Sequence, residues 1–182
     1  MFARTPRLTL RPGWPEDAPA LARAIAHEPV ARMLTHVPFP YGEADAATFL
    51  ARPCTASEPR FLIFAHDRDA TPLLVGGIGI TPYETGPELG YWLTPDAWGR
   101  GYATEAGRAV VAMARDALPL TRLSAWHFVD NPASGRVLRK LGFQPTGRTL
   151  VKRSGARASD AASIEYALDL SDDAHHPMPI AA

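Results

Sequence analysis

A glycine-bearing turn between a strand-like and a helix-like segment is the part of this sequence best suited to hold an anionic ligand. It reads Trp98-Gly99-Arg100-Gly101-Tyr102-Ala103-Thr104-Glu105. The first turn of a helix presents unpaired backbone N–H groups and the positive end of the helix dipole. Glycine lets the backbone come close to a ligand, Arg100 adds a cation and Thr104 adds a hydroxyl or a helix cap. We therefore predict a pyrophosphate site here, although a tight turn alone would also favour small residues.

Two common phosphate-binding motifs do not occur in the chain. No segment reads GxxxxGK followed by Ser or Thr, which excludes a P-loop nucleotidase. The turn does not read GxGxxG, because Thr104 stands three positions after Gly101, and no strand–helix repeat precedes it. A Rossmann-type dinucleotide fold is therefore not expected.

A second segment places polar side chains at the start of a helix. Asn131 is a favoured N-cap residue and Pro132 is suited to the first helical position. Ser134 shares the apolar face of this helix with Val137, Leu138 and Leu141, so it points inward. A buried serine needs a hydrogen-bond partner. Ser134 is therefore either a small residue for close packing or a hydroxyl that faces a site.

The elements that must position these residues follow from periodicity and turn residues. Strands are expected at 8–11, 61–66, 73–80, 88–93, 122–129, 146–152 and 163–170. Helices are expected at 15–25, at about 46–50, from about Thr104 to Ala117, and from Pro132 to just before Gly142. The three strands from 61 to 93 suggest an antiparallel meander, and a strand–helix–strand unit lies at the centre. The fold class is therefore mixed α/β (α+β).

The segments that carry this chemistry resemble the GNAT acetyltransferases, in particular the branch of the ribosomal-protein N-terminal acetyltransferases. The run from 88 to 106 resembles the core of that family. The family's Arg/Gln-x-x-Gly-x-Gly/Ala motif falls on Trp98 to Ala103, with Trp98 in place of Arg or Gln. The run from Asn131 to Phe143 resembles the family's Asn-x-x-Ser…Leu-Gly-Phe segment. The similarity extends from about residue 4 to 170.

The resemblance implies a fold and a cofactor. The fold is a mostly antiparallel sheet of about seven strands with about four helices, splayed between the fourth and fifth strands. A bulge is expected at Gly90 in the fourth strand. The co-substrate is acetyl-CoA, with no metal. The residues that the resemblance places against it are Trp92, Leu93, Arg100, Gly101, Tyr102, Ala103, Thr104, Asn131 and Ser134.

The resemblance also implies direct acetyl transfer to an amine, without an acyl-enzyme. The candidate general base is Glu88, with His127 or a water molecule as alternatives, and a plain surface carboxylate remains an equal reading of Glu88. Many relatives use a tyrosine as general acid where this chain has Leu138, so Ser134 is the candidate here. Phe39 and Tyr41 are expected on the substrate side, and the hairpin loop 154–159 is expected to form another wall. The acceptor stays open among a peptide N-terminus, an aminoglycoside, a polyamine and another small amine.

Composition limits the remaining classes. The chain has 182 residues, one cysteine and equal numbers of cations and anions. Residues 1–170 are expected to form one domain and 171–182 a disordered tail in which His175 and His176 bind no metal. Cys54 is expected to be an inert loop residue. No apolar run is long enough for a signal peptide or a membrane span, so a cytoplasmic location is expected.

Zero net charge argues against a nucleic-acid partner, although the stretch from 131 to 159 holds seven cations and no acid. A solvated basic face is the simplest interpretation of that stretch. Two rival functions remain: a non-catalytic sensor of CoA or acyl-CoA on the same fold, and an RNA-associated binding module. The oligomeric state is open, and the resemblance leaves room for a homodimer.

Overall fold

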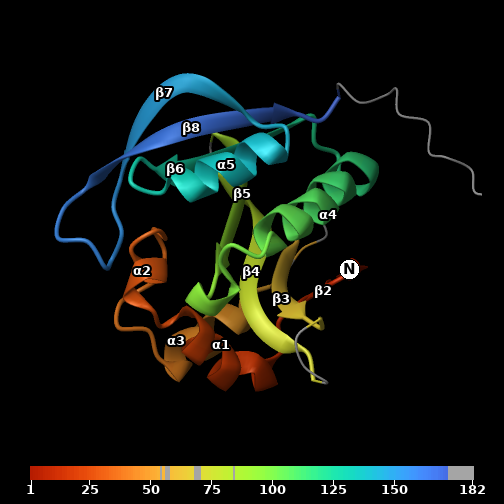
Figure 1. The fold of residues 1–182 in the computed structure, drawn as a ribbon, viewed down its shortest axis with the longest axis vertical. Coiled ribbons are helices and arrows are strands. Elements are labelled where there is room, and N and C mark those ends of the chain that lie inside the picture. The colour runs from red at the N-terminus through yellow and green to blue at the C-terminus, as the bar shows by residue number, and fades with distance from the viewer. Residues whose placement is uncertain (54, 56–57, 68–70, 84, 172–182) are drawn as a thin grey trace, which may run out of the picture.

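A computed structural model describes residues 1–53, 55, 58–67, 71–83 and 85–171 of the chain. These residues form one eight-stranded sheet with the strand order β1-β2-β3-β4-β5-β6-β8-β7 (Figure 1). Cys54 and the tail from 172 onward, with His175 and His176, lie outside the described residues. In the described part, no helix is both long enough and apolar enough to span a bilayer.

The N-terminal part of the chain supplies five strands and three short helices. Their bounds are β1 (Ala3–Arg4), β2 (Leu8–Arg11), α1 (Ala18–Ile25), α2 (Glu28–Ala31), α3 (Glu43–Leu50), β3 (Arg60–Ala65), β4 (Leu73–Tyr83) and β5 (Gly86–Leu93). Strands β1 to β5 pair in chain order and antiparallel, which confirms the predicted meander. A 3₁₀ turn, Pro15–Asp17, leads into α1.

The C-terminal part supplies two helices and three strands. Their bounds are α4 (Tyr102–Ala117), β6 (Arg122–Phe128), α5 (Pro132–Lys140), β7 (Gln144–Lys152) and β8 (Ala161–Asp169). A second 3₁₀ turn, Pro95–Ala97, precedes α4. The predicted mixed fold is confirmed, with eight strands and five helices in the described part instead of about seven and four. The additional elements, β1 and α2, are two and four residues long, too short to give a periodic signal.

The sheet opens between β5 and β6. These two strands are parallel, and they pair at a single position, Glu88 with Ser124. By contrast, β4 pairs with β5 along the whole length of β5, and β6 pairs with β8 along seven positions. The predicted splay between the fourth and fifth long strands is therefore present as a split that begins just after Glu88.

Helices cover both faces of the sheet. Side chains alternate between the two faces along each strand, so one strand contributes to a core on each face. On one face, Phe61 and Ile63 of β3 join a large core with α4 and Leu138 of α5. On the other face, Leu62 packs with α1 and α3. In Figure 1, α4 and α5 cross the sheet, whereas α1, α2 and α3 gather at its lower end. Different helices therefore cover the two faces of the sheet that contains the split.

Two predicted details differ from the structure. The β4–β5 register runs without a shift from Gly76–Leu93 to Tyr83–Gly86, so the bulge expected at Gly90 is wrong. Gly90 lies directly opposite Gly79, and neither residue carries a side chain that would have to be re-aimed. Helix α4 begins at Tyr102, two residues before the expected start, because Gly101 with its left-handed φ of 81° is the N-cap.

The α5 boundaries confirm the capping prediction. The Asn131 side chain accepts a hydrogen bond from the Ser134 amide at 3.3 Å. At the other end, Phe143 N donates to Leu138 O and Gly142 N donates to Arg139 O, with Gly142 in the left-handed region at φ 93°. This pair of bonds is the Schellman arrangement. Both ends of the helix that carries Ser134 are therefore fixed.

Candidate active site

The turn before α4 presents backbone amides rather than side chains. Gly99 and Gly101 have φ values of 73° and 81°, a conformation that other residues rarely adopt. The first hydrogen bond of the helix runs from Glu105 N to Gly101 O. Gly101 has no side chain to cap the amides of Tyr102, Ala103 and Thr104. Tyr102 and Ala103 bury their side chains, so only their main-chain groups are accessible to a ligand at this end of the helix.

The other two residues predicted at this turn differ in exposure. Thr104 is half-buried on the first turn of α4, beside the shallow depression at the helix N-terminus. Arg100 is exposed, and its Nε donates to Asp96 O at 3.1 Å. The guanidinium is therefore held back along the turn that precedes the helix.

Glu105 ties this turn to the N-terminal strand pair, a role that the sequence did not reveal. Its carboxylate accepts from Thr5 Oγ1 at 2.6 Å and from Arg7 Nε at 2.8 Å, and Arg7 Nη1 donates to Arg100 O. Burial alone would raise the pKa of Glu105, but the hydrogen bonds from Thr5 and Arg7 and the charge of Arg7 hold that pKa below its usual range. The loop is therefore anchored by a residue 98 positions away in the sequence.

The edge of β5 that faces the split also presents its backbone. Thr94 N donates to Val75 O, so by the alternation of an antiparallel pair the main-chain groups of Tyr91 and Leu93 face away from β4. The Trp98 indole agrees with this orientation, because its Nε1 donates to Leu93 O at 2.9 Å. Trp98, which departs from the family motif, therefore holds the end of β5. The Trp92 side chain lies over Gly77 of β4, on the face of the sheet opposite to the side chains of Tyr91 and Leu93.

Ser134 meets a tyrosine that sequence reasoning missed. Tyr91 Oη lies 2.7 Å from Ser134 Oγ and 3.2 Å from Ser134 O. Tyr91 comes from β5 and Ser134 from α5, so this pair bridges the split. Burial raises the pKa of Tyr91 to about 12, and its hydroxyl therefore stays protonated at neutral pH. The inward direction predicted for Ser134 suits this contact, although nothing in the sequence pairs the two residues.

Glu88 lies at the inner end of the split, on the face opposite to Tyr91. The Trp126 indole of β6 donates to Glu88 Oε1 at 2.8 Å. Burial raises the pKa of Glu88, while the Trp126 hydrogen bond and the charge of Lys152 oppose the rise. Glu88 is therefore a half-buried carboxylate that holds a proton more strongly than an exposed glutamate.

A cavity of about 390 Å³ adjoins Glu88 on the face covered by α1 and α3. Tyr41 and Trp92 are among its lining residues. Phe39 is not among them, and its side chain is 41% exposed. The segment before it contributes instead, through Met33 to Pro38. The cavity therefore includes one of the two side chains expected on the substrate side.

His127, the rival base, is buried on the other face of β6. Its Nδ1 lies 2.8 Å from Phe128 O and its Nε2 lies 3.5 Å from Tyr166 Oη. A Cβ at Gly135 of α5 would come within 2.5 Å of the ring. His127 is thus packed under α5, away from the cavity.

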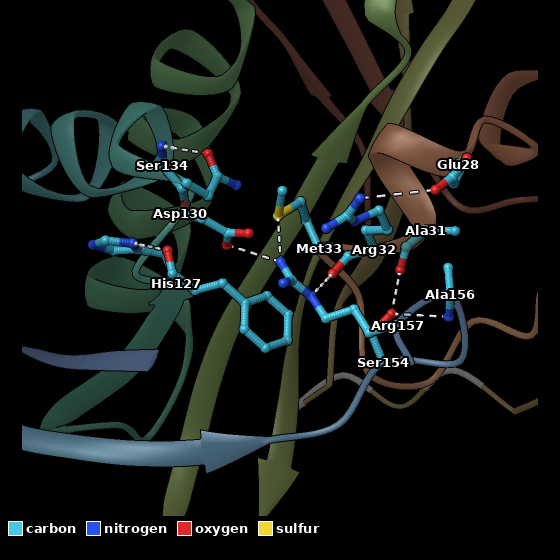
Figure 2. A network of polar contacts seen from close by, with 12 residues as sticks. Glu28, Ala31, Arg32, Met33, His127, Asp130, Ser134, Ser154, Ala156 and Arg157 are labelled. Atoms are coloured by element: carbon cyan, nitrogen blue, oxygen red, sulfur yellow. Dashed lines mark hydrogen bonds and ion pairs between the residues drawn. The ribbon is translucent and has the colours of Figure 1, made fainter. Parts of the chain in front are cut away.

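The hairpin loop between β7 and β8 contacts the segment at the end of α2 that leads into the cavity wall. Figure 2 shows Arg157 reaching between Asp130, to which it donates at 2.8 Å, and the carbonyl of Arg32. Ser154 is buried and donates to Ala31 O at 2.8 Å. The loop does not line the cavity; it fixes α2, whose continuation supplies the wall.

Most of the basic stretch is engaged within the chain. Arg148 and Arg153 form ion pairs with Glu165 and Asp160. Arg139 donates to Tyr166 Oη, and Lys152 lies over the Trp126 ring. Together with Arg157, five of the seven cations have a partner in the described residues. Five of the seven are also exposed, so the stretch is a solvated basic face that forms contacts within the chain. The exposed cations are Arg136, Arg139, Lys140, Arg148 and Arg153. Among those residues, no group of three or more His, Cys, Asp or Glu side chains is placed to hold a metal ion.

Comparison with known proteins fits this arrangement. The family profile described as "Acetyltransferase (GNAT) domain" matches residues 7–144. The chain belongs to the GNAT acetyltransferase family. YoaA of Bacillus subtilis, described as an uncharacterized N-acetyltransferase, is 32% identical over 146 residues, which cover 79% of this chain and 82% of YoaA.

Solved GNAT structures share the fold. An acetyltransferase of the GNAT family from Bacillus anthracis has a TM-score of 0.78 at 24% identity, over 93% of this chain and 99% of that chain. RimL, a ribosomal-protein alpha-N-acetyltransferase solved in complex with coenzyme A, has a TM-score of 0.73 at 18% identity, over 93% of this chain and 98% of that chain. The neighbours of this GNAT protein thus include the ribosomal-protein branch.

Proposed function

We propose that this GNAT protein transfers an acetyl group from acetyl-CoA directly to a primary amine. One observation carries the proposal: the split between β5 and β6 has a helix N-terminus with main-chain amides at its outer end and a half-buried carboxylate beside a cavity at its inner end. A donor that carries a pyrophosphate and an acceptor that must lose a proton need these two environments.

The residues present fit acetyl-CoA. Gly101 leaves room at the α4 N-terminus, because a Cβ there would meet no atom closer than Arg7 Nη2 at 3.5 Å. A depression beside this turn is lined by the cations Arg4, Arg7, Arg108 and Lys140 and by one acid, Glu105. An anion is therefore favoured both by the helix dipole and by nearby positive charge. The outward-facing amides of Tyr91 and Leu93 suit the extended amide-bearing arm of the co-substrate.

The side chains around the split divide the proton transfers between them. Acetyl-CoA supplies an acetyl thioester, which is an activated acyl donor. Glu88 takes a proton from the amine, directly or through a water molecule, because its raised pKa makes it a stronger base than an exposed carboxylate. The amine nitrogen then bonds to the acetyl carbon as the carbon–sulfur bond breaks. The Leu93 amide is oriented to donate to the acetyl oxygen as negative charge develops there.

The leaving thiolate needs a proton, and the Tyr91–Ser134 pair is placed to give one. The two hydroxyls share a hydrogen bond of 2.7 Å, so Ser134 can donate to the sulfur while Tyr91 returns a proton to Ser134. Solvent then restores the Tyr91 proton, and Glu88 gives up the amine's proton to solvent, once the products have left. Asn131 fixes the first turn of α5 and with it the position of Ser134. In this scheme Asn131 acts through the helix end rather than on the reacting atoms.

The test is thiol release from acetyl-CoA in the presence of a panel of primary amines, with acetyl-CoA binding measured calorimetrically in parallel. Amine-dependent release with formation of the N-acetyl product is expected. Tight binding with no release for any amine would instead support a CoA sensor. Absence of acetyl-CoA binding would overturn the proposal, and salt-dependent RNA binding in its place would favour the RNA module.

A further inference from the structure

The cavity beside Glu88 is walled by aromatic rings. Trp126 comes from β6, Trp92 from β5 and Phe49 from α3, and all three line the cavity together with Tyr41. On the side where β4 pairs with the start of β5, the His36 and Tyr83 rings also line the cavity and stack, with centroids 6.1 Å apart and an angle of 21°. Aromatic walls bind flat apolar groups well and also attract cations to their faces.

The floor of the cavity is bare. Along β5, Glu88, Gly90 and Trp92 share one face, and across the ladder Gly79 lies opposite Gly90 and Gly77 opposite Trp92. A Cβ at Gly77 would come within 2.7 Å of Trp92 Nε1, so Gly77 lets the indole lie flat on β4. A Cβ at Gly90 would meet no atom within 4 Å. Gly90 therefore leaves an open strip between the indole and the Glu88 carboxylate.

The charged groups around the cavity suit a single amine rather than a polycation. Asp45 Oδ2 already accepts from Gly42 N at 2.9 Å, where it caps α3. Arg60 donates to the carbonyls of Arg52 and Pro53 and lies over the Phe49 ring. Glu88 is thus the carboxylate beside the open strip, and Arg52 and Arg60 oppose a second positive charge on a ligand.

We propose that the acceptor is a small primary amine that carries one compact apolar or aromatic group. The nitrogen lies at Glu88 and the group lies on the Gly90 strip against Trp92. The cavity of about 390 Å³ is at the lower end of the usual range for ligand pockets, which limits the acceptor to a small molecule. This inference rests on the proposed acetyl transfer and names the amine that the same site takes.

The test compares four amines: 2-phenylethylamine, spermidine, kanamycin and a hydrophilic peptide with a free N-terminus. For each amine, kcat/KM is measured by thiol release, and binding to the protein–CoA complex is measured calorimetrically. The diagnostic variant is Gly90→Val, which fills the strip with a side chain that has free space around its Cβ. The matched control is Ala162→Val, which adds branched carbon atoms at an exposed position of β8.

The expected result is a kcat/KM for 2-phenylethylamine at least about 10-fold above that for the other three amines. Gly90→Val should lower that value by about 10-fold or more through KM, with acetyl-CoA affinity unchanged. Ala162→Val should leave both values unchanged. A preference for spermidine, kanamycin or the peptide would overturn the inference, as would an unaffected Gly90→Val enzyme.

The binding measurement separates this inference from the proposed function. Saturable binding of 2-phenylethylamine that Gly90→Val abolishes, without any thiol release, would support the inferred amine specificity of the cavity and overturn the proposed acetyl transfer. Thiol release with other amines, without binding of 2-phenylethylamine, would do the reverse.

Discussion

The two ends of the split are made of different parts of the polypeptide. At the outer end, the α4 N-terminus and the edge of β5 present main-chain amides, and the side chains of Tyr102 and Ala103 point into the core. At the inner end, Glu88, Trp126 and the aromatic walls present side chains. A site made of main-chain amides depends little on the identity of its side chains, whereas a side-chain-made site can change without disturbing the fold. Substitutions at the two ends should therefore affect different steps.

The largest effect is expected from Glu88→Gln, which keeps the shape of the side chain and removes the base. The value of kcat should fall by about 10²–10⁴-fold while acetyl-CoA affinity stays unchanged. Steady-state kinetics and calorimetry measure the two quantities. Glu16→Gln is the control, because Glu16 is an exposed carboxylate that does not line the cavity. An unchanged kcat in Glu88→Gln would remove this residue from the mechanism.

A smaller loss is expected when the proton donor is altered. Tyr91→Phe and Ser134→Ala should each lower kcat by about 10-fold, and the double variant should lose little more than Ser134→Ala, because the two hydroxyls act as a unit. A general acid works below its pKa, and the pKa of Tyr91 is about 12. The rate should therefore show no loss of this acid up to about pH 10. Fully additive losses would show that the hydroxyls act separately.

The pH dependence of kcat/KM should move when Trp126 is changed to Phe. Glu88 must be ionised to act as a base, so the rate rises as pH rises through the Glu88 pKa. The Trp126 hydrogen bond stabilises the carboxylate and lowers that pKa. Its removal should shift the acidic limb of the profile to higher pH. The control is Trp14→Phe, which changes a tryptophan stacked on Arg11 and should leave the acidic limb in place. A shift in Trp14→Phe, or no shift in Trp126→Phe, would show that the acidic limb does not report the Glu88 pKa.

The smallest effect concerns stability. Glu105→Gln should lower the free energy of unfolding by about 1–3 kcal/mol at neutral pH, because charged hydrogen bonds to Thr5 and Arg7 are lost. The folded-state pKa of Glu105 lies below its unfolded value. Its stabilisation is therefore present above the unfolded pKa of about 4.3 and is lost as pH falls through the folded pKa.

Urea titrations at pH 7 and in acid measure this difference. Asp160→Asn, which breaks an exposed ion pair with Arg153, should change stability by less than about 1 kcal/mol. A Glu105→Gln effect that persists unchanged in acid would contradict the charge-based explanation.

The local structure of the backbone-made end could be predicted almost completely from the sequence. Glycines at 99 and 101, the helix periodicity after them, and the Asn131 cap each leave a local pattern, because their role depends on residues next to them. The element order and the antiparallel meander followed in the same way. The bulge at Gly90 was the exception, since a bare strand position has the same sequence pattern as a bulge.

Glu88 and Tyr41 could be named as candidates for the side-chain-made end, but the contacts there could not be predicted, because they join segments far apart. Tyr91 and Ser134 are 43 residues apart, and Glu88 and Trp126 are 38 apart. Phe39 and Tyr41 have the same aromatic character in sequence, yet the turn between α2 and α3 directs one outward and the other into the cavity. The Glu105 anchor depends on β1 and β2 meeting α4, which only the folded sheet brings about.

The most direct measurement is the calorimetric affinity for acetyl-CoA of Gly101→Ala and Gly147→Ala. Both glycines have nearly the same left-handed φ, 81° and 80°, so both substitutions add a similar strain of about 1–2 kcal/mol. Gly101 caps α4, whereas Gly147 lies in β7 with no atom within 4 Å of its added Cβ. We predict an affinity loss of about 10-fold or more in Gly101→Ala alone. Equal affinities in the two variants would contradict a cofactor site made by the backbone at the α4 N-terminus.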